Sequence, residues 1–399
     1  MAWSTAESSC SRISNSCLRS PKLAEQGEQS VTEKVTPAQP ADITKRLARW
    51  SAYACVLAIV VIMLGAWTRL VDAGLGCPDW PGCYGFLTVP QSETSIAIAN
   101  ARFPETPVDV SKGWPEMIHR YAAGILGLVV FALAATAVRH RRVGVPFKLP
   151  LFIAAFILLQ GAFGAWTVTL KLWPQVVALH LLGGFTTLSL LLLLTLRLRK
   201  GAQAGSDRVQ TPSASLGRFR PWLYGGLLLI ILQIALGAWT AANYAAVACT
   251  DLPTCQDQWW PEGMDFQHGF DITQQVGPNY LGGQLTADGR VAIHVTHRLG
   301  AVIVLGYFLV LLGLLWRHRG TNHLDRSIIL VAAALALQIA LGLANVWLHI
   351  PLSIAVAHNA MGAGLLLSMV HLIWRHHQLP YTETSPATHT TTINREVTA

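Results

Sequence analysis

Residues 115–138 read PEMIHRYAAGILGLVVFALAATAV, and residues 292–315 read AIHVTHRLGAVIVLGYFLVLLGLL. Each stretch is apolar after its first few positions, and about 20 mostly apolar residues are enough for a helix to cross a bilayer. A histidine stands near the start of both, as His119 and His297. An ionisable side chain inside a span is costly unless it faces a cofactor, a partner or water. The two stretches therefore predict membrane helices that carry functional histidines.

These stretches belong to a longer internal repeat. Cys77 and Cys83 recur 172 positions later as Cys249 and Cys255, together with the GAWT of residues 65–68. This part of the repeat has an offset of 172 positions, whereas the later part has an offset of 178, and the six-residue difference indicates a loop insertion. Five further residues recur 178 positions later: His119 as His297, Arg120 as Arg298, Gln160 as Gln338, Gly164 as Gly342 and His180 as His358.

Composition indicates an integral membrane protein. Hydrophobic residues make up 52% of the chain and charged residues only 13%, whereas a soluble domain carries about 25% charge. The sequence contains eight candidate spans, four in each half. Because four is an even number, both halves enter the membrane from the same side. We expect an all-α protein with two tandem four-helix bundles related by a pseudo-two-fold axis. The eight expected spans are roughly residues 50–70, 115–138, 149–170, 174–196, 222–244, 292–315, 328–348 and 352–374.

Domain boundaries follow from these spans and from the polar segments around them. A Ser-rich first segment and a Thr-rich last segment lack the apolar residues of a core, so we expect disorder in both. The expected domains are a cytoplasmic tail (1–45), an N-terminal bundle (46–200), a cytoplasmic linker (201–220), a C-terminal bundle (221–376) and a second tail (377–399).

Lysines and arginines orient the spans, because short cytoplasmic loops retain them. They cluster before the first span, between spans 2 and 3, and after spans 4 and 6. Both termini are therefore expected in the cytoplasm, with the repeated histidines toward the opposite side. The net charge of +8 is a topology feature. Because these cations flank spans and form no stripe with aromatic residues, nucleic acid is not expected as a partner.

The four repeated histidines are the candidate metal or haem ligands. A four-helix bundle can present side chains from facing helices to a central cofactor, and neutral imidazole is a good ligand for haem iron. A single histidine in a span is more often a hydrogen-bonded packing residue. Four at duplicated positions and a common depth favour ligation, by His119 with His180 and by His297 with His358.

The halves differ beside the first histidine. Glu116 lies one turn before His119 on the same helical face, and its counterpart is His294. A carboxylate there could exchange protons or hold a cation at a haem edge; the alternative is an interfacial Glu favoured by the helix dipole. Arg120 and Arg298 are candidate contacts for haem propionates, or ordinary arginines that reach the interface.

The paired cysteines lie in the two long outer loops. An oxidising compartment favours disulfides within the pairs Cys77 with Cys83 and Cys249 with Cys255. Zinc binding is one alternative, and thiol exchange by the first pair is another.

A shorter motif recurs within the repeat and carries glycine at a fixed place. Residues 160–167 read QGAFGAWT, 233–240 read QIALGAWT, 338–345 read QIALGLAN, and the first span ends in LGAWT. Small residues at such positions let helices approach closely, and clearance for a haem plane is compatible with that packing.

Four motifs together resemble the haem A synthase family, in its bacterial type with cysteine pairs in the outer loops. They are EMIHRYAAG (116–124), GLGCPDWPGCYG (74–85), VVALHLLGG (176–184) and IHVTHRLGA (293–301), and the likeness covers about residues 45–376. The resemblance implies an oxidoreductase that converts the C8 methyl group of haem O to a formyl group, giving haem A for terminal oxidases. It also implies that His119 and His180 hold the substrate haem, that Glu116 is catalytic, and that His297 and His358 bind the iron of haem B. Cys77 and Cys83 match the family's paired cysteines.

Two other function classes use the same histidines. A di-haem b-type electron-transfer subunit would hold both haems and modify neither, and a haem transporter or chaperone is a third reading. For a synthase we expect residence in a bacterial inner membrane, surrounded by lipid. Haem O synthase, the protohaem farnesyltransferase, and a second copy of the chain are candidate partners, and the residues do not identify the electron-transfer partner.

Overall fold

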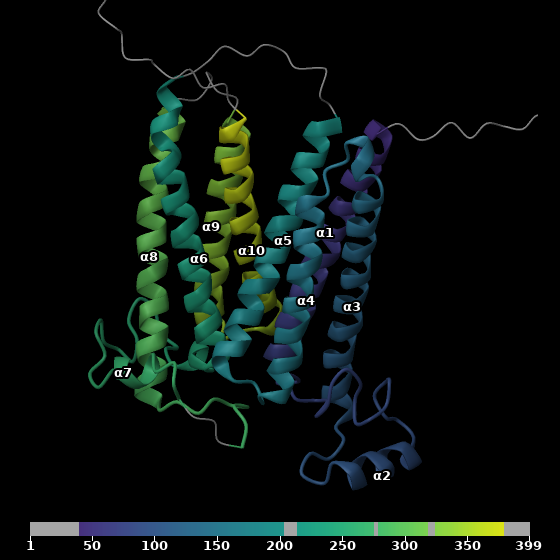
Figure 1. Ribbon diagram of the computed structural model, residues 1–399. Coiled ribbons are helices and arrows are strands. Elements are labelled where there is room, and N and C mark those ends of the chain that lie inside the picture. The colour runs from purple at the N-terminus through teal and green to yellow at the C-terminus, as the bar shows by residue number, and fades with distance from the viewer. Residues whose placement is uncertain (1–39, 203–213, 275–277, 318–323, 379–399) are drawn as a thin grey trace, which may run out of the picture. The chain divides into compact units, whose positions relative to one another are not determined.

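The computed structural model describes residues 40–202, 214–274, 278–317 and 324–378, and for residues 214–216 it describes the backbone only. Eight long helices dominate this part of the chain (Figure 1). Each is long and apolar enough to cross a membrane, which confirms the all-α fold class and the eight spans of a multi-pass membrane protein. They are α1 (Pro40–Leu70), α3 (Val110–Arg139), α4 (Lys148–Thr169), α5 (Pro174–Ala202), α6 (Arg220–Ala242), α8 (Ala287–Arg317), α9 (Asp325–Trp347) and α10 (Leu352–His377).

Apolar side chains cover the outside of these helices as well as the inside. Leu128, Val302 and Leu309 are 71%, 66% and 65% exposed, whereas Leu188 and Leu191 of α5 are fully buried. Water-soluble proteins rarely expose continuous apolar surface of this kind. In a bilayer the same surface contacts lipid, and packing inside depends on close fit between helices.

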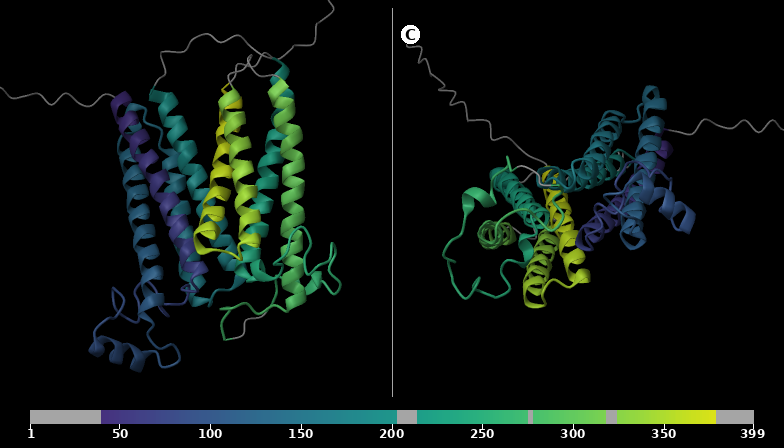
Figure 2. Two further views of the ribbon diagram at one scale, coloured as in Figure 1. Left: turned by 180° about the vertical axis from the view of Figure 1, so that it is seen from behind. Right: turned by 90° about the horizontal axis from the view of Figure 1, so that it is seen from below.

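Helix contacts follow the order of the repeat. In the first half, α1 and α4 each contact both α3 and α5. In the second half, α6 and α9 each contact both α8 and α10. The halves meet where α10 packs against α1 and α5, and where α5 packs against α6; α10 and α1 lie side by side in both views of Figure 2.

The segments between α1 and α3 and between α6 and α8 lie beyond the same end of the helices (Figure 1). The first contains α2 (Glu93–Arg102), which begins with a capping box in which Ser92 and Ser95 satisfy each other's backbone N–H groups. The second contains the short helices η3 (Ala245–Val247) and α7 (Phe266–Gly269). None of these helices was expected from the apolar pattern, because that pattern reports spans only.

Some expected boundaries differ from the helix ends. α1 begins at Pro40, so residues 40–45 are helical where a tail was expected. The helix η2 (Ala214–Phe219) lies within the expected linker. The remaining parts of both tails, and linker residues 203–213, lie outside the described residues.

Candidate functional site

His119 of α3 and His180 of α5 face each other in the first half. Their ring centroids are 6.4 Å apart, and their ring planes are nearly perpendicular, at 89°. Imidazole nitrogens bind transition metals at about 2 Å, so two axial imidazoles on one haem iron place their ring centres roughly 6 Å apart. The spacing of this pair is that of two ligands on opposite sides of one iron.

His297 of α8 and His358 of α10 occupy the equivalent places in the second half. The two imidazoles lie close enough to interact electrostatically. In both halves the helices that carry the histidines are bridged by two others, α1 and α4 or α6 and α9. The structure thus brings together both pairs that the repeat singled out.

A glycine faces each of the four imidazoles. A Cβ added at Gly65 would lie 2.9 Å from Cε1 of His119. At Gly164, Gly237 and Gly342 the corresponding distance, to His180, His297 and His358 respectively, would be 3.1 Å. Such contacts are closer than normal packing allows. The glycines of the repeated motif therefore leave room for imidazoles, in addition to bringing helices together.

A glutamine amide contacts three of the four histidines. Nε2 of Gln160 lies 3.1 Å from Nδ1 of His180 and donates a hydrogen bond to the backbone oxygen of the same residue at 2.6 Å. Gln233 does the same to His297, at 3.1 and 2.9 Å. Nε2 of Gln338 lies 3.3 Å from Nε2 of His358. These contacts orient the imidazole rings relative to the backbone.

The residues present fit a haem with two axial imidazoles. In the first half the ring spacing of 6.4 Å suits one iron, and in both halves a glycine leaves room for each imidazole. Nδ1 of His119 and Nδ1 of His358 are buried without a hydrogen-bond partner, an arrangement that costs about 1–3 kcal/mol unless a ligand compensates for it. Within the described residues, no three histidine, cysteine or acidic side chains gather as a site for a bare metal ion.

Glu116 lies one turn from His119 and is only 4% exposed. One carboxylate oxygen accepts a hydrogen bond from the backbone N–H of Cys77 at 2.9 Å. The other is paired with the guanidinium of Arg120. Both oxygens are thus held in place, and the group is tied directly to the cysteine loop.

His294, the counterpart of Glu116, makes different contacts. Its Nδ1 lies 3.0 Å from the backbone oxygen of Ala245 in η3, which precedes the second cysteine loop. The replacement of Glu116 by His294 in the second half therefore also changes the hydrogen-bond partner, from Cys77 to Ala245.

Arg120 and Arg298 both bind backbone oxygens of the cysteine loops. Arg120 donates to Asp79 at 2.9 Å and to Gly82, and Arg298 donates to Thr254 at 2.7 Å and to Cys249 at 3.0 Å. The two arginines therefore hold the loops against α3 and α8. Nε of Arg298 is buried without a partner, so this donor is available to a further acceptor.

Both cysteine pairs are at disulfide distance. The S–S distance is 2.00 Å for Cys77 with Cys83 and 1.96 Å for Cys249 with Cys255. Sulfur atoms bonded to each other are not zinc-binding thiolates, so the zinc alternative does not describe these pairs.

The two cysteine loops share one turn. The carboxylate of Asp79 accepts hydrogen bonds from the backbone N–H groups of Tyr84 and Gly85 at 2.6 and 2.7 Å. Asp251 accepts from Gln256 and Asp257 at 2.8 and 3.1 Å. The pKa of Asp251 lies below its ordinary value because the Thr254 hydroxyl and these N–H groups favour the charged form. The Cys-x-Asp-x-Pro-x-Cys pattern therefore encodes the same turn twice.

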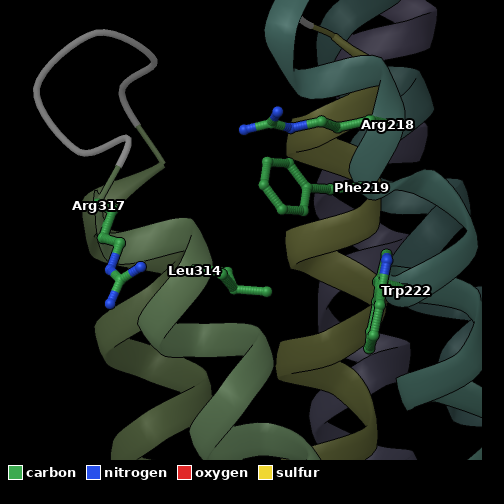
Figure 3. A pocket seen from close by; sticks show the side chains of 5 residues that line it. All are labelled: Arg218, Phe219, Trp222, Leu314 and Arg317. Carbon is green, nitrogen blue, oxygen red and sulfur yellow. The ribbon is translucent and has the colours of Figure 1, made fainter.

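A cavity of about 400 Å³ lies at the other end of the second half (Figure 3). It is lined by Arg218, Phe219 and Trp222 near the start of α6 and by Leu314 and Arg317 near the end of α8. Leu314 follows His297 by 17 residues in one helix, which corresponds to about 25 Å at 1.5 Å per residue. This cavity is separate from the histidine sites.

The fold and the histidine pairs define a class: multi-pass membrane proteins with a duplicated bis-histidine site suited to haem. Residues 48–370 match the family described as cytochrome oxidase assembly protein. That match covers most of the chain, which therefore belongs to this family.

Curated relatives carry one common name. The chain is 44% identical to the "Heme A synthase" of Shewanella oneidensis over 322 residues, which cover 80% of this chain and 94% of the relative. It is 30% identical to the "Heme A synthase" of an Exiguobacterium species over 60% of this chain and 70% of the relative. A "Heme A synthase" of Sphingopyxis alaskensis is 26% identical over 80% and 89%. The resemblance found in the sequence motifs is confirmed.

Two features of the site were not anticipated. The hydrogen bond from the Cys77 backbone N–H to the Glu116 carboxylate joins residues far apart in the sequence, and no local sequence pattern predicts it. The contact of Gln233 and Gln338 with histidines could have been inferred, because a glutamine precedes the glycine by four positions in three of the four repeated motifs.

Proposed function

We propose that this chain is a haem A synthase, an oxidoreductase that converts the C8 methyl group of haem O to the formyl group of haem A. Membership of the family and the name shared by its relatives support this activity. The structural observation that carries the proposal is the imidazole pair with rings 6.4 Å apart, placed one helical turn from a buried carboxylate.

We assign the substrate to the first half and haem B to the second. His119 and His180 would hold haem O, and His297 and His358 would hold haem B. The basis of this assignment is Glu116, whose counterpart in the second half is His294 instead of a carboxylate. The bundles proposed at residues 46–200 and 221–376 each contain one such pair, joined by the linker at 201–220.

The reaction sets the demands on the protein. A methyl group and one water give a formyl group, four protons and four electrons, in two two-electron steps. The bound haem iron supplies the redox chemistry, and the protein supplies position and electrostatics. Electrons would leave by way of the second half, where two histidine ligands favour a low-spin haem suited to electron transfer.

Glu116 is the proposed catalytic residue. Its oxygens are held by the Cys77 N–H and the Arg120 guanidinium, so it needs little reorganisation when charge develops nearby. We assign it one of two tasks: to stabilise positive charge at the reacting carbon, or to accept a proton from the attacking water. The carboxylate is placed for either task because it lies on the same helical face as His119.

The arginines have mainly a supporting part in this proposal. Arg120 and Arg298 anchor the cysteine loops, and the unpartnered Nε of Arg298 is the donor we assign to a haem propionate. Both disulfides require an oxidising compartment. This agrees with residence in a bacterial inner membrane, with the histidine ends of the helices outside and both termini in the cytoplasm.

The partners in this proposal follow from the substrate. Haem O arrives from haem O synthase, which we propose as a neighbour in the membrane, and a second copy of the chain is a further candidate partner. The product would serve cytochrome oxidase biogenesis, in agreement with the family description.

The deciding experiment is expression in a bacterial host that makes haem O and lacks haem A. Haem is extracted from the membranes and separated by chromatography. Haem A should appear with the chain and be absent with the empty vector. Retention of haem O without any haem A would contradict the synthase and favour a di-haem electron-transfer subunit.

The ligand assignment has its own test in the optical spectrum. Alanine at His297 or His358 should abolish the low-spin bis-histidine spectrum of haem B. An unchanged spectrum in both variants would reject these ligands.

A further inference from the structure

The helices repeat one local arrangement four times, more often than the twofold repeat of the halves requires. In each case one helix supplies a glycine and the neighbouring helix supplies the histidine that faces it. The helix pairs are α1 with α3, α4 with α5, α6 with α8, and α9 with α10. In the last three pairs, a glutamine four residues before the glycine contacts the same histidine.

The glutamine contacts restrict the imidazoles. Gln160 and Gln233 each bind both a ring nitrogen and the backbone oxygen of one histidine, so the ring cannot turn without breaking the contact. An amide turned by 180° exchanges its oxygen and its nitrogen. The same side chain can therefore accept the proton on one ring nitrogen when the other binds iron, which is the usual support for a metal-bound histidine. Oε1 of Gln233 and Oε1 of Gln338 are buried without a partner and are available for this task.

The first arrangement lacks the glutamine. The position four residues before Gly65 is Val61. Its backbone forms a hydrogen bond with the His119 ring, as the backbone of Gln160 does with His180 and that of Gln338 with His358, so the difference lies in the side chain alone. A valine side chain can neither donate nor accept a hydrogen bond. Nδ1 of His119 is buried without a partner, and so is Nδ1 of His358. His119 is thus the one imidazole of the four that no side-chain amide contacts.

We propose that Gln160, Gln233 and Gln338 are positioning residues that hold their imidazoles ready for axial coordination, and that Val61 leaves His119 as the releasable ligand. Haem O would bind by forming its bond to His119 last, and haem A would leave by breaking that bond first, while His180 stays in place. The haem of the second half, held by two supported imidazoles, remains bound. This inference rests on the proposed function, because a substrate must exchange and a resident cofactor must not.

The test measures haem loss from the purified protein, loaded by co-expression with a haem O source, to an excess of apomyoglobin. Haem O, counted together with any haem A formed from it, and haem B that reach the apomyoglobin are separated by chromatography and timed. In the unmodified protein, haem O should leave at least tenfold faster than haem B. Val61→Gln supplies the missing amide, and it should slow the loss of haem O about tenfold without changing that of haem B. This corresponds to ~1.4 kcal/mol.

Val61→Leu is the matched control, because it enlarges the side chain without adding an amide. It should leave both rates unchanged. Equal rates of haem O loss from Val61→Gln and Val61→Leu would overturn the proposal, and so would loss of haem B ahead of haem O from the unmodified protein.

Gln233→Leu keeps the inference testable if Val61→Gln does not fold. It should speed the loss of haem B about tenfold and change the electron paramagnetic resonance g-values of this low-spin haem, since these depend on how the imidazoles are oriented. An unchanged rate with unchanged g-values would overturn the positioning role. Haem loss needs no turnover, so a protein that binds haem but makes no haem A would contradict the proposed function alone.

Discussion

The carboxylate of Glu116 accepts a hydrogen bond from the backbone N–H of Cys77, at 2.9 Å. This bond links the proposed catalytic group to a disulfide in a loop outside the membrane spans. The corresponding position in the second half, His294, bonds instead to Ala245. The first disulfide is therefore coupled to the proposed reaction site in a way that the second is not.

Replacement of Glu116 tests its catalytic role. In Glu116→Ala, haem should remain bound, because neither His119 nor His180 loses a ligand atom. Haem A formation should fall at least a hundredfold, as is typical for loss of a positioned acid–base group. Glu116→Gln keeps the shape and removes the charge, and it should be nearly as inactive. The measurement is the ratio of haem A to haem O extracted from membranes. Normal haem A output from the alanine variant would defeat the assignment.

The two disulfides provide a matched comparison. Serine at Cys77 and Cys83 should free the loop that holds Glu116 and lower haem A formation about tenfold or more. Misplacement of a reacting group by about 1 Å can cost a hundredfold. Serine at Cys249 and Cys255 removes an equivalent disulfide from the loop held by Arg298, and it should leave oxidation within about twofold.

Haem content, measured in the same membranes, distinguishes loss of haem binding from loss of haem O oxidation in this comparison. Haem O should accumulate in the first double variant. If both double variants lose activity equally, the coupling through Cys77 and Glu116 is not what makes the first disulfide important.

Two glycines of α4 test the clearance for an imidazole. Alanine at Gly164 would place a Cβ 3.1 Å from His180, whereas a Cβ at Gly161 meets nothing within 4 Å. Both changes replace glycine by a better helix former, so only the contact differs. Gly164→Ala should displace the ring and lower haem occupancy in the first half several-fold. Gly161→Ala should match the unmodified protein. Equal haem spectra in the two variants would show that the glycine serves helix packing alone.

Much of this architecture could be predicted because membrane spans are encoded locally. Twenty apolar residues with flanking cations identify a span, and the duplicated register of His119, His180, His297 and His358 identified pairs that the fold brings together. The loops could not be predicted in the same way. α2 has no apolar period, and the partners of Arg120 and Glu116 are backbone groups distant in sequence.

Arg120 and Arg298 show most clearly what could not be predicted from the sequence. Their chemistry suits propionates and backbone oxygens equally well, because a guanidinium donates to either. Only the path of the loop decides which acceptor is nearby. Arg120 and Arg298 bind loop carbonyl groups, which the sequence alone could not distinguish from a haem contact.

Arg69 joins the two halves at the end of α1. It donates hydrogen bonds to the backbone oxygens of Ala241 and Ala242 at 3.0 and 3.2 Å, and its guanidinium lies 3.9 Å from the centre of the Tyr244 ring. The last carbonyl groups of a helix have no partner within it, and a cation there is also favoured by the helix dipole. Loss of this side chain should therefore loosen the contact between α1 and α6.

Arg69→Ala should lower the free energy of unfolding by about 2 kcal/mol, the usual effect of hydrogen bonds to a charged group, as measured by denaturation in detergent. Tyr244→Phe is the control. It keeps the ring under the guanidinium and removes only the exposed hydroxyl that donates to Asp72 at 2.9 Å, so it should cost less than about 0.5 kcal/mol. The low-spin spectrum of haem B should persist in both variants, because no histidine contact changes. An Arg69→Ala protein as stable as Tyr244→Phe would show that the halves are held together by helix packing alone.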